Sequence, residues 1–235
     1  MRVKLLTLAA LVAGFGAFSS LAAAADDPGA QENTREIPWP TKSWQTSSPE
    51  EQGMDSARLA KLIESVGTYK QDSLTIIRHG KIVADAYYAP YVAGVSHDLR
   101  SVTKSIVSTL IAIELQKGEL DSVDHPVVDL FSDKHIQDAD ENKKAITVQN
   151  LLDMNSGIAW VEKLYTPGET IMQMYESADR TAFVLNQPMA AAPGASFYYN
   201  SGNPYLLSAV INRKSGQNAF EFAKKELFEP LGIKS

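Results

Sequence analysis

The stretch Leu99-Arg-Ser-Val-Thr-Lys-Ser-Ile-Val-Ser-Thr-Leu-Ile-Ala-Ile-Glu-Leu-Gln-Lys-Gly118 decides how the rest of the chain is interpreted. Its apolar pattern predicts a helix over Leu99–Gln116, the strongest in the sequence, which Gly118 ends. Ser101 and Lys104 are three residues apart near the start of this helix, so they share one face. Any chemistry at the helix start would therefore involve these two side chains together.

The spacing of Ser101 and Lys104 fits the pattern S-x-x-K. A serine hydroxyl is a weak nucleophile until a neighbouring base takes its proton, and a lysine with a lowered pKa can be that base. The start of a helix adds positive potential where an oxyanion would form. The alternative is a helix-capping serine followed by a solvated lysine, and these four residues alone favour that alternative.

The segments before this helix predict a small sheet. A helix begins near Asp55 or Ser56 and ends at Gly67. The β-rich runs 73–78 and 81–87 flank the turn His79-Gly80 and predict an antiparallel hairpin. Two strands make a marginal sheet, and no convincing partner strand follows residue 86.

The segments after the helix are predicted to be mostly helical, which makes the fold class α+β. Between them, the charged residues 133–144 are interpreted as a solvated loop. The predicted helices cover Ile146–Met154, Ile171–Leu185, about Asn203–Lys214 and Ala219–Phe228.

The N-terminus has the order of a secretory signal. Basic Arg2 and Lys4 precede an apolar run, and small residues lead to an A-x-A site that ends at Ala25. The apolar run is shorter than the roughly 20 residues of a membrane span. We therefore expect residues 1–25 to be removed and the mature protein to be secreted or periplasmic, without stable membrane insertion. Residues from 26 to about 49 are predicted to be an extended leader that lays Trp39 and Trp44 on the domain surface.

Composition excludes several classes of function. Without residues 1–25 the chain has 20 Lys and Arg against 28 Asp and Glu, a net charge of −8, which argues against nucleic-acid partners. Cysteine is absent, so disulfides and thiolate chemistry are excluded. The four histidines have no metal-binding spacing, and no glycine-rich loop suggests a nucleotide. We expect neither a metal nor a cofactor.

A second candidate element is Pro193-Gly-Ala-Ser-Phe-Tyr-Tyr-Asn-Ser-Gly202. A tyrosine phenol close to a serine–lysine pair can relay protons when the lysine charge favours its phenolate. The alternative is a tyrosine-rich loop that packs over a helix start.

Taken together, several segments resemble the serine β-lactamase and penicillin-binding-protein family, specifically its class C-like branch. That branch includes DD-peptidases, carboxylesterases and 6-aminohexanoate-dimer hydrolases. The matching stretches occur in the family's order and span the mature chain: residues 48–55, 100–105, 146–157, 197–201 and 228–233.

The resemblance implies a role for each matching residue. Ser101 would be the acylated nucleophile, and Lys104 would be its proton partner. The branch's Y-x-N element fits Tyr198-Tyr199-Asn200 or one residue later, and an ungapped match favours Tyr199 as the catalytic tyrosine. Ser201 then stands in the substrate-binding position where the family usually has Asn. That departure favours an ester or a linear amide over a β-lactam.

The resemblance also implies a β-lactamase/transpeptidase-like fold, in which an antiparallel sheet is flanked by helices and joined to a helical subdomain. The family's third element, K-T-G or a His-containing equivalent, lies on a strand far downstream, whereas this chain ends at Ser235. We therefore expect residues 26–235 to be the N-terminal part of such a domain, with the C-terminal strands missing. The expected activity is acyl-enzyme hydrolysis of a small ester, amide or β-lactam. The alternative is a non-catalytic or truncated module of the cell envelope, and the oligomeric state stays open.

Overall fold

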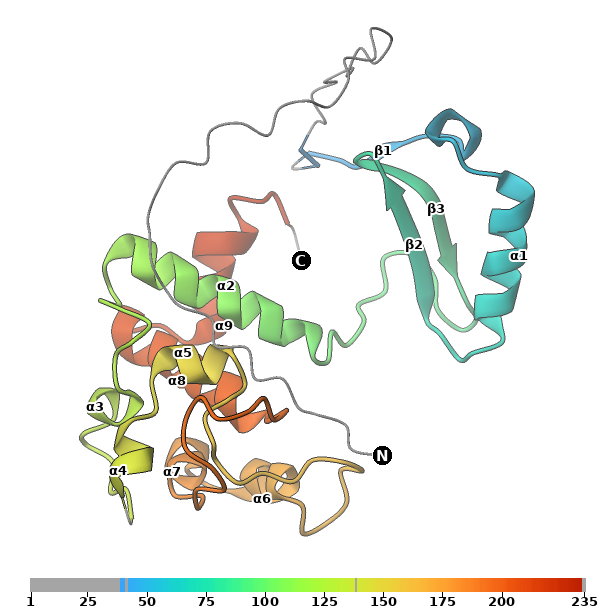
Figure 1. Ribbon diagram of the computed structural model, residues 1–235. Coiled ribbons are helices and arrows are strands. Elements are labelled where there is room, and N and C mark those ends of the chain that lie inside the picture. Colours follow the sequence, from blue (N-terminus) through green and yellow to red (C-terminus); the bar gives the residue numbers. More distant parts are fainter. Residues whose placement is uncertain (1–38, 41, 138, 234–235) are drawn as a thin grey trace, which may run out of the picture. The chain divides into compact units, whose positions relative to one another are not determined.

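The computed structural model describes residues 39–40, 42–137 and 139–233 (Figure 1). The predicted signal peptide, residues 1–25, lies outside this range, as does most of the predicted leader. Trp39 and Trp44, which belong to that leader, are both exposed. Within the described part of the chain, no helix is both long enough and apolar enough to cross a bilayer.

The predicted hairpin is confirmed and gains a third strand. Strands β2 (Ser73–Arg78) and β3 (Lys81–Tyr87) pair antiparallel around the turn at His79 and Gly80. The short strand β1 (Gln45–Thr46) comes from the leader and pairs parallel to β3, which gives the strand order β1-β3-β2. The sheet is therefore mixed, with one parallel and one antiparallel pairing, and its third strand precedes the hairpin in the sequence.

Helix α1 (Ser56–Gly67) confirms the first predicted helix. The carboxylate of Asp55 accepts a hydrogen bond from the backbone N–H of Arg58, as expected of an N-cap residue. At the other end, the hydroxyl of Tyr88 donates to the carbonyl of Ile63 over 2.8 Å, which attaches the helix to the chain that leaves β3. The cap at Asp55 is a local contact, which explains why the start of α1 agrees with the sequence prediction.

The helical part is built around two helices that pack against each other, α2 (Val102–Lys117) and α8 (Gly202–Ser215) (Figure 1). The shorter helix α5 (Val148–Leu152) packs against α8, and α9 (Ala219–Ala223) packs against both long helices. Each long helix ends at a glycine with left-handed backbone, Gly118 and Gly216. The buried side chains they share include Val107, Leu110, Ile111, Leu151, Leu206, Leu207, Val210, Ile211 and Phe222.

The remaining helices correct three predictions. Residues 171–185 form two helices, because Ser177 is extended and the Asp179 carboxylate caps a new start. Residues 219–228 continue from α9 into a π-helix. The charged segment 133–144 contains a short helix in which Lys143 is buried. The bounds of these helices, and of α3, are α3 (Val127–Leu130), α4 (Glu141–Lys144), α6 (Thr170–Glu176), α7 (Arg180–Leu185) and the π-helix Lys224–Phe228.

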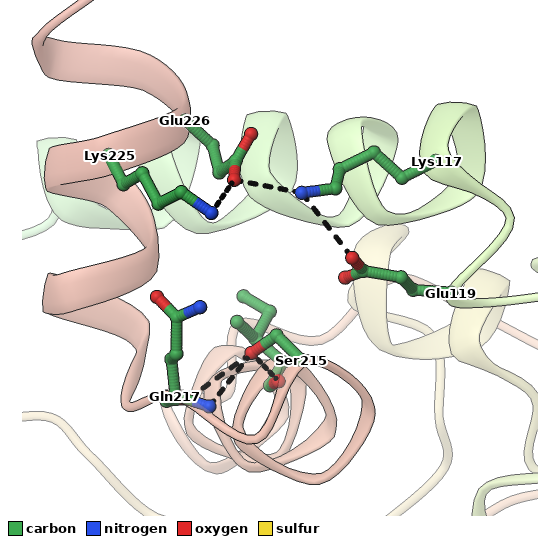
Figure 2. A network of polar contacts seen from close by, with 7 residues as sticks. Lys117, Glu119, Ser215, Gln217, Lys225 and Glu226 are labelled. Carbon is green, nitrogen blue, oxygen red and sulfur yellow. Dashed lines mark hydrogen bonds and ion pairs between the residues drawn. The ribbon is translucent and has the colours of Figure 1, made fainter.

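The C-terminal end of α2 carries a charged network. Figure 2 shows Lys117 between two carboxylates, 2.8 Å from Glu226 and 3.3 Å from Glu119, with Lys225 on the far side of Glu226. One turn earlier, Glu114 is fully buried, and neither of its carboxylate oxygens has a hydrogen-bond partner among the described residues. Burial and the charge of Glu119 raise the pKa of Glu114 to about 7, against the opposing effect of Lys214 and Lys117.

Candidate active site

The Ser101 hydroxyl lies at the start of helix α2 but does not cap it. Arg100 has a left-handed backbone with φ of 47°, so the helix begins at Val102 and not at Leu99 as predicted. The backbone N–H of Arg100 donates to the Asp98 carboxylate over 3.0 Å, which fixes the turn. Ser101 occupies the N-cap position, yet its side chain makes no capping hydrogen bond. The alternative of a helix-capping serine is therefore wrong.

Two other predicted site residues, Lys104 and Tyr199, lie next to this hydroxyl. The Nζ atom of Lys104, one turn further along α2, donates to Ser101 Oγ over 3.1 Å. The phenol oxygen of Tyr199 lies 2.6 Å from the same Oγ atom, although 98 residues separate the two in sequence. Lys104 Nζ also lies 4.9 Å from the centre of the Tyr199 ring. Their catalytic roles stay a prediction, but the required proximity is present.

The surroundings of Tyr199 favour its ionised form. Burial alone would raise the pKa of the phenol, because the phenolate would lose hydration. Hydrogen bonding by Lys104 and Ser101, together with the positive charge of Lys104, outweighs burial and lowers the pKa below its ordinary value of 10.0. The negative charge of Glu162 acts in the opposite direction. A larger fraction of Tyr199 is therefore phenolate near neutral pH, and available to accept a proton, than for an isolated tyrosine.

Two backbone hydrogen bonds hold the segment that carries Tyr199. The N–H of Gly194 donates to the carbonyl of Asn155 over 2.8 Å, and the N–H of Tyr198 donates to the carbonyl of Met154 over 2.7 Å. Two residues after Asn155, Gly157 has a left-handed backbone with φ of 76°. A Cβ added at Gly157 would overlap the carbonyl oxygen of Ala191. Only glycine fits that backbone and that space. Met154 and Asn155, which directly follow α5, thus hold the segment that carries the Tyr199 phenol.

Ser201 also lies in the site, and both its hydroxyl and its backbone N–H already donate hydrogen bonds to Glu162. Its hydroxyl donates to Glu162 Oε1 over 2.7 Å, and its backbone N–H donates to Glu162 Oε2 over 2.7 Å. The same carboxylate accepts from the Trp160 indole over 2.6 Å and from the Tyr165 hydroxyl over 3.2 Å. Glu162 was not among the predicted site residues, because it lies 39 residues from Ser201 and has no motif of its own.

A cavity of about 390 Å³ opens beside the Ser101 hydroxyl. Aromatic and apolar side chains from several helices form much of its wall, while Ser201 and Lys104 contribute polar atoms. Among the described residues, no group of three or more His, Asp or Glu side chains is arranged to hold a metal ion. The residues that line the cavity are Asp98, Arg100, Ser101, Thr103, Lys104, Val107, Tyr165, Met174, Tyr175, Ser201, Pro204, Tyr205 and Ser208.

Solved structures of similar fold support the architecture. A putative 6-aminohexanoate-dimer hydrolase from Bacillus anthracis is 17% identical, with a TM-score of 0.61 over 74% of this chain and 47% of that one. EstCE1, a hydrolase with promiscuous acyltransferase activity, is 18% identical, with a TM-score of 0.61 over 76% and 52%. An octameric penicillin-binding protein homologue from Pyrococcus abyssi is 25% identical, with a TM-score of 0.56 over 77% and 44%. The chain thus spans about half the length of the structures it matches.

Comparisons of the sequence alone were made against curated proteins and against protein families. None of the curated proteins matches the chain. The sequence profile of the Beta-lactamase family, in contrast, matches residues 59–235, which include Ser101, Lys104 and Tyr199. This match confirms the resemblance expected from the motifs, and with it the β-lactamase/transpeptidase-like fold. The chain belongs to the Beta-lactamase family of serine hydrolases and penicillin-binding proteins.

Proposed function

We propose that the protein is a serine hydrolase that acts through an acyl-enzyme on Ser101. The observation that carries this proposal is the position of Ser101 Oγ, 2.6 Å from the Tyr199 phenol and 3.1 Å from Lys104 Nζ. A nucleophile and its base within hydrogen-bond reach are the geometric requirement for nucleophilic catalysis. The lowered pKa of Tyr199 supports the phenolate as the group that accepts the serine proton.

The proposed reaction has two steps. In the first, Ser101 Oγ bonds to the substrate carbonyl carbon while its proton passes to the Tyr199 phenolate. The tetrahedral intermediate then collapses, and the leaving alcohol or amine takes that proton as its bond to the carbonyl carbon breaks. In the second step, water adds to the acyl-enzyme and gives a proton to Tyr199. That proton then passes to Ser101 Oγ as the ester bond breaks, which releases the carboxylic acid and regenerates both Ser101 and the Tyr199 phenolate. Lys104 keeps its charge next to the phenolate and favours it throughout.

We propose a small ester or linear amide as the substrate, ahead of a β-lactam. In this chain Ser201 replaces the asparagine that the resemblance leads one to expect, and both its hydroxyl and its backbone N–H are bound to Glu162. Ser201 therefore has no free donor to hold a β-lactam amide. The cavity of about 390 Å³, with Tyr165, Tyr175 and Tyr205 in its wall, suits a compact acyl group with apolar character.

Labelling with an alkyl fluorophosphonate tests the proposal. The wild-type protein is expected to gain one adduct, and mass spectrometry of the peptide that bears residue 101 should find it on the serine. The Ser101→Ala variant is the matched control and should not be labelled. Turnover of a p-nitrophenyl ester should then exceed turnover of a chromogenic cephalosporin. A folded wild-type protein without an adduct would refute the proposal.

A binding module without turnover is the second candidate. The replacement at Ser201 favours it, because its hydroxyl and its backbone N–H are bound to Glu162 and neither is free to hold a substrate amide. Stable stoichiometric labelling of Ser101 with a fluorescent penicillin, with no hydrolysis of an ester or an amide, would support this candidate over the enzyme.

A further inference from the structure

Glu162 is a polar group next to the site, and the proposed reaction does not use it. Its two carboxylate oxygens accept four hydrogen bonds, two of them from Ser201 and the others from Trp160 and Tyr165. Hydrogen bonds to an ionised acceptor are about twice as strong as those between neutral groups. Glu162 therefore joins the segment around residues 160–165 to the start of α8.

The position of this junction relates it to the nucleophile. Ser201 is two residues after Tyr199, so fixing the Ser201 backbone also restrains the phenol. On the other side, Tyr165 lines the cavity and has a left-handed backbone with φ of 55°. Glu162 thus restrains both Tyr199, whose phenol contacts the Ser101 hydroxyl, and Tyr165 in the cavity wall.

The charge of Glu162 also acts on the phenol. The charged and titratable groups around Tyr199 are Lys104 on α2, Glu162, and Tyr165 on the following loop. Asp98 and Arg100 also line the cavity, but they form an ion pair with each other at 2.9 Å. Lys104 favours the Tyr199 phenolate, whereas the carboxylate of Glu162 opposes it and raises the pKa of the phenol. Burial of the phenol and its hydrogen bonds to Lys104 and Ser101 have larger effects, and the charge of Glu162 adds a smaller one that raises the pKa of Tyr199.

We propose that Glu162 is a positioning residue that fixes the Tyr199–Ser201 segment through its two hydrogen bonds from Ser201 and places a negative charge near the Tyr199 phenol. This inference rests on the proposed function, because it assigns Glu162 to the same acylation step. Glu162 does not touch the reacting atoms, and its effect passes through Ser201 and Tyr199.

A second carboxylate in the same loop provides a matched control. Glu169 accepts hydrogen bonds from the backbone N–H groups of Lys163, Leu164 and Tyr165 and from the hydroxyl of Thr166. It organises the loop from within and makes no hydrogen bond to Ser201 or Tyr199. Replacing it loosens the loop, whereas replacing Glu162 loosens the loop and also removes the charge that opposes the phenolate.

The experiment measures the acylation rate of Ser101 by a fluorophosphonate from about pH 5 to pH 10 in the full chain. In Glu162→Gln, we expect the maximal rate to fall about 10- to 100-fold, since small displacements of reacting groups cost this much. We also expect the acidic limb of the pH profile to move to lower pH, because the phenolate no longer faces an anion. Glu169→Gln should lower the rate and leave the limb where it is.

Glu162→Asp keeps the charge and shortens the reach, so it should lower the rate without moving the limb. It also serves as the test if Glu162→Gln does not fold, as judged by far-ultraviolet circular dichroism and a cooperative thermal transition. A limb that stays in place in Glu162→Gln, or that moves equally in Glu169→Gln or Glu162→Asp, would overturn the inference. A wild-type protein that is never acylated would overturn the proposed function itself, so the two failures are distinguishable.

Discussion

Replacing Glu114 by glutamine should make the protein more stable at neutral and alkaline pH. The side chain is fully buried on α2, and its carboxylate oxygens have no hydrogen-bond partner among the described residues. Burial and the nearby Glu119 raise its pKa from 4.5 to about 7. Above that pH the folded state must hold an unpaired buried anion, which the unfolded chain exposes to water.

The size of the effect follows from the difference in pKa between the folded and unfolded states. One pKa unit corresponds to about 1.4 kcal/mol, so Glu114 accounts for about 3 kcal/mol. Because the folded pKa is the higher one, the unfolded state loses its proton first as the pH rises. The free energy of unfolding therefore falls from about pH 4.5 to about pH 7. Above pH 7 this loss of stability is complete. The Glu114→Gln variant avoids it, because glutamine does not ionise.

Urea unfolding of the wild type and Glu114→Gln at about pH 5 and pH 8 measures this difference. A buried glutamine leaves its own polar atoms unpaired at a cost of about 1–3 kcal/mol, but that cost does not depend on pH. We therefore expect the free energy of the variant relative to the wild type to rise by up to about 3 kcal/mol between the two pH values. Glu64→Gln, which changes an exposed carboxyl on α1, is the control and should show no such rise. An equal relative stability of Glu114→Gln at both pH values would refute the reasoning.

Three further predictions concern the site, the core and the N-terminus. Lys104→Met should reduce Ser101 acylation by about 10²- to 10⁴-fold, because the phenolate loses its cation; rates with a fluorophosphonate check this, and a wild-type rate would contradict it. Thr147→Ala removes the capping box at the start of α5 and should lower the urea-derived free energy of unfolding by about 1 kcal/mol, whereas no loss would exclude a capping role. Export should remove residues 1–25, so mass spectrometry of the secreted protein should find Asp26 at the N-terminus; an intact Met1 would exclude cleavage.

Local signals allowed part of the fold to be predicted. Both ends of α1 and the β2–β3 hairpin agree with the prediction, because a capping aspartate and a glycine turn act within a few residues. Strand β1 was missed because its two residues have no pattern of their own and depend on pairing with β3. The break between α6 and α7 was missed although Asp179 is a recognisable cap, since the apolar spacing continues across it.

The candidate site was predictable to the extent that motifs carry it. The S-x-x-K spacing places Ser101 and Lys104 on one helix face from sequence alone. The proximity of Tyr199 required the family resemblance, because no local rule connects residues 98 positions apart. Glu162 stayed hidden for the same reason, and its partner Ser201 was predicted to hold substrate, whereas in the structure it holds a carboxylate.

The support beneath Tyr199 makes the number of residues there more critical than their identity. Gly194 and Tyr198 are both anchored to the end of α5, so three residues must bridge a fixed span. Side chains at positions 195–197 can vary, but inserting or deleting one residue shifts the chain by about 3.3 Å, more than the tolerance of a hydrogen bond. Related sequences that retain the phenol should therefore keep this bridge constant in length while its composition drifts, and loop grafting is better attempted elsewhere.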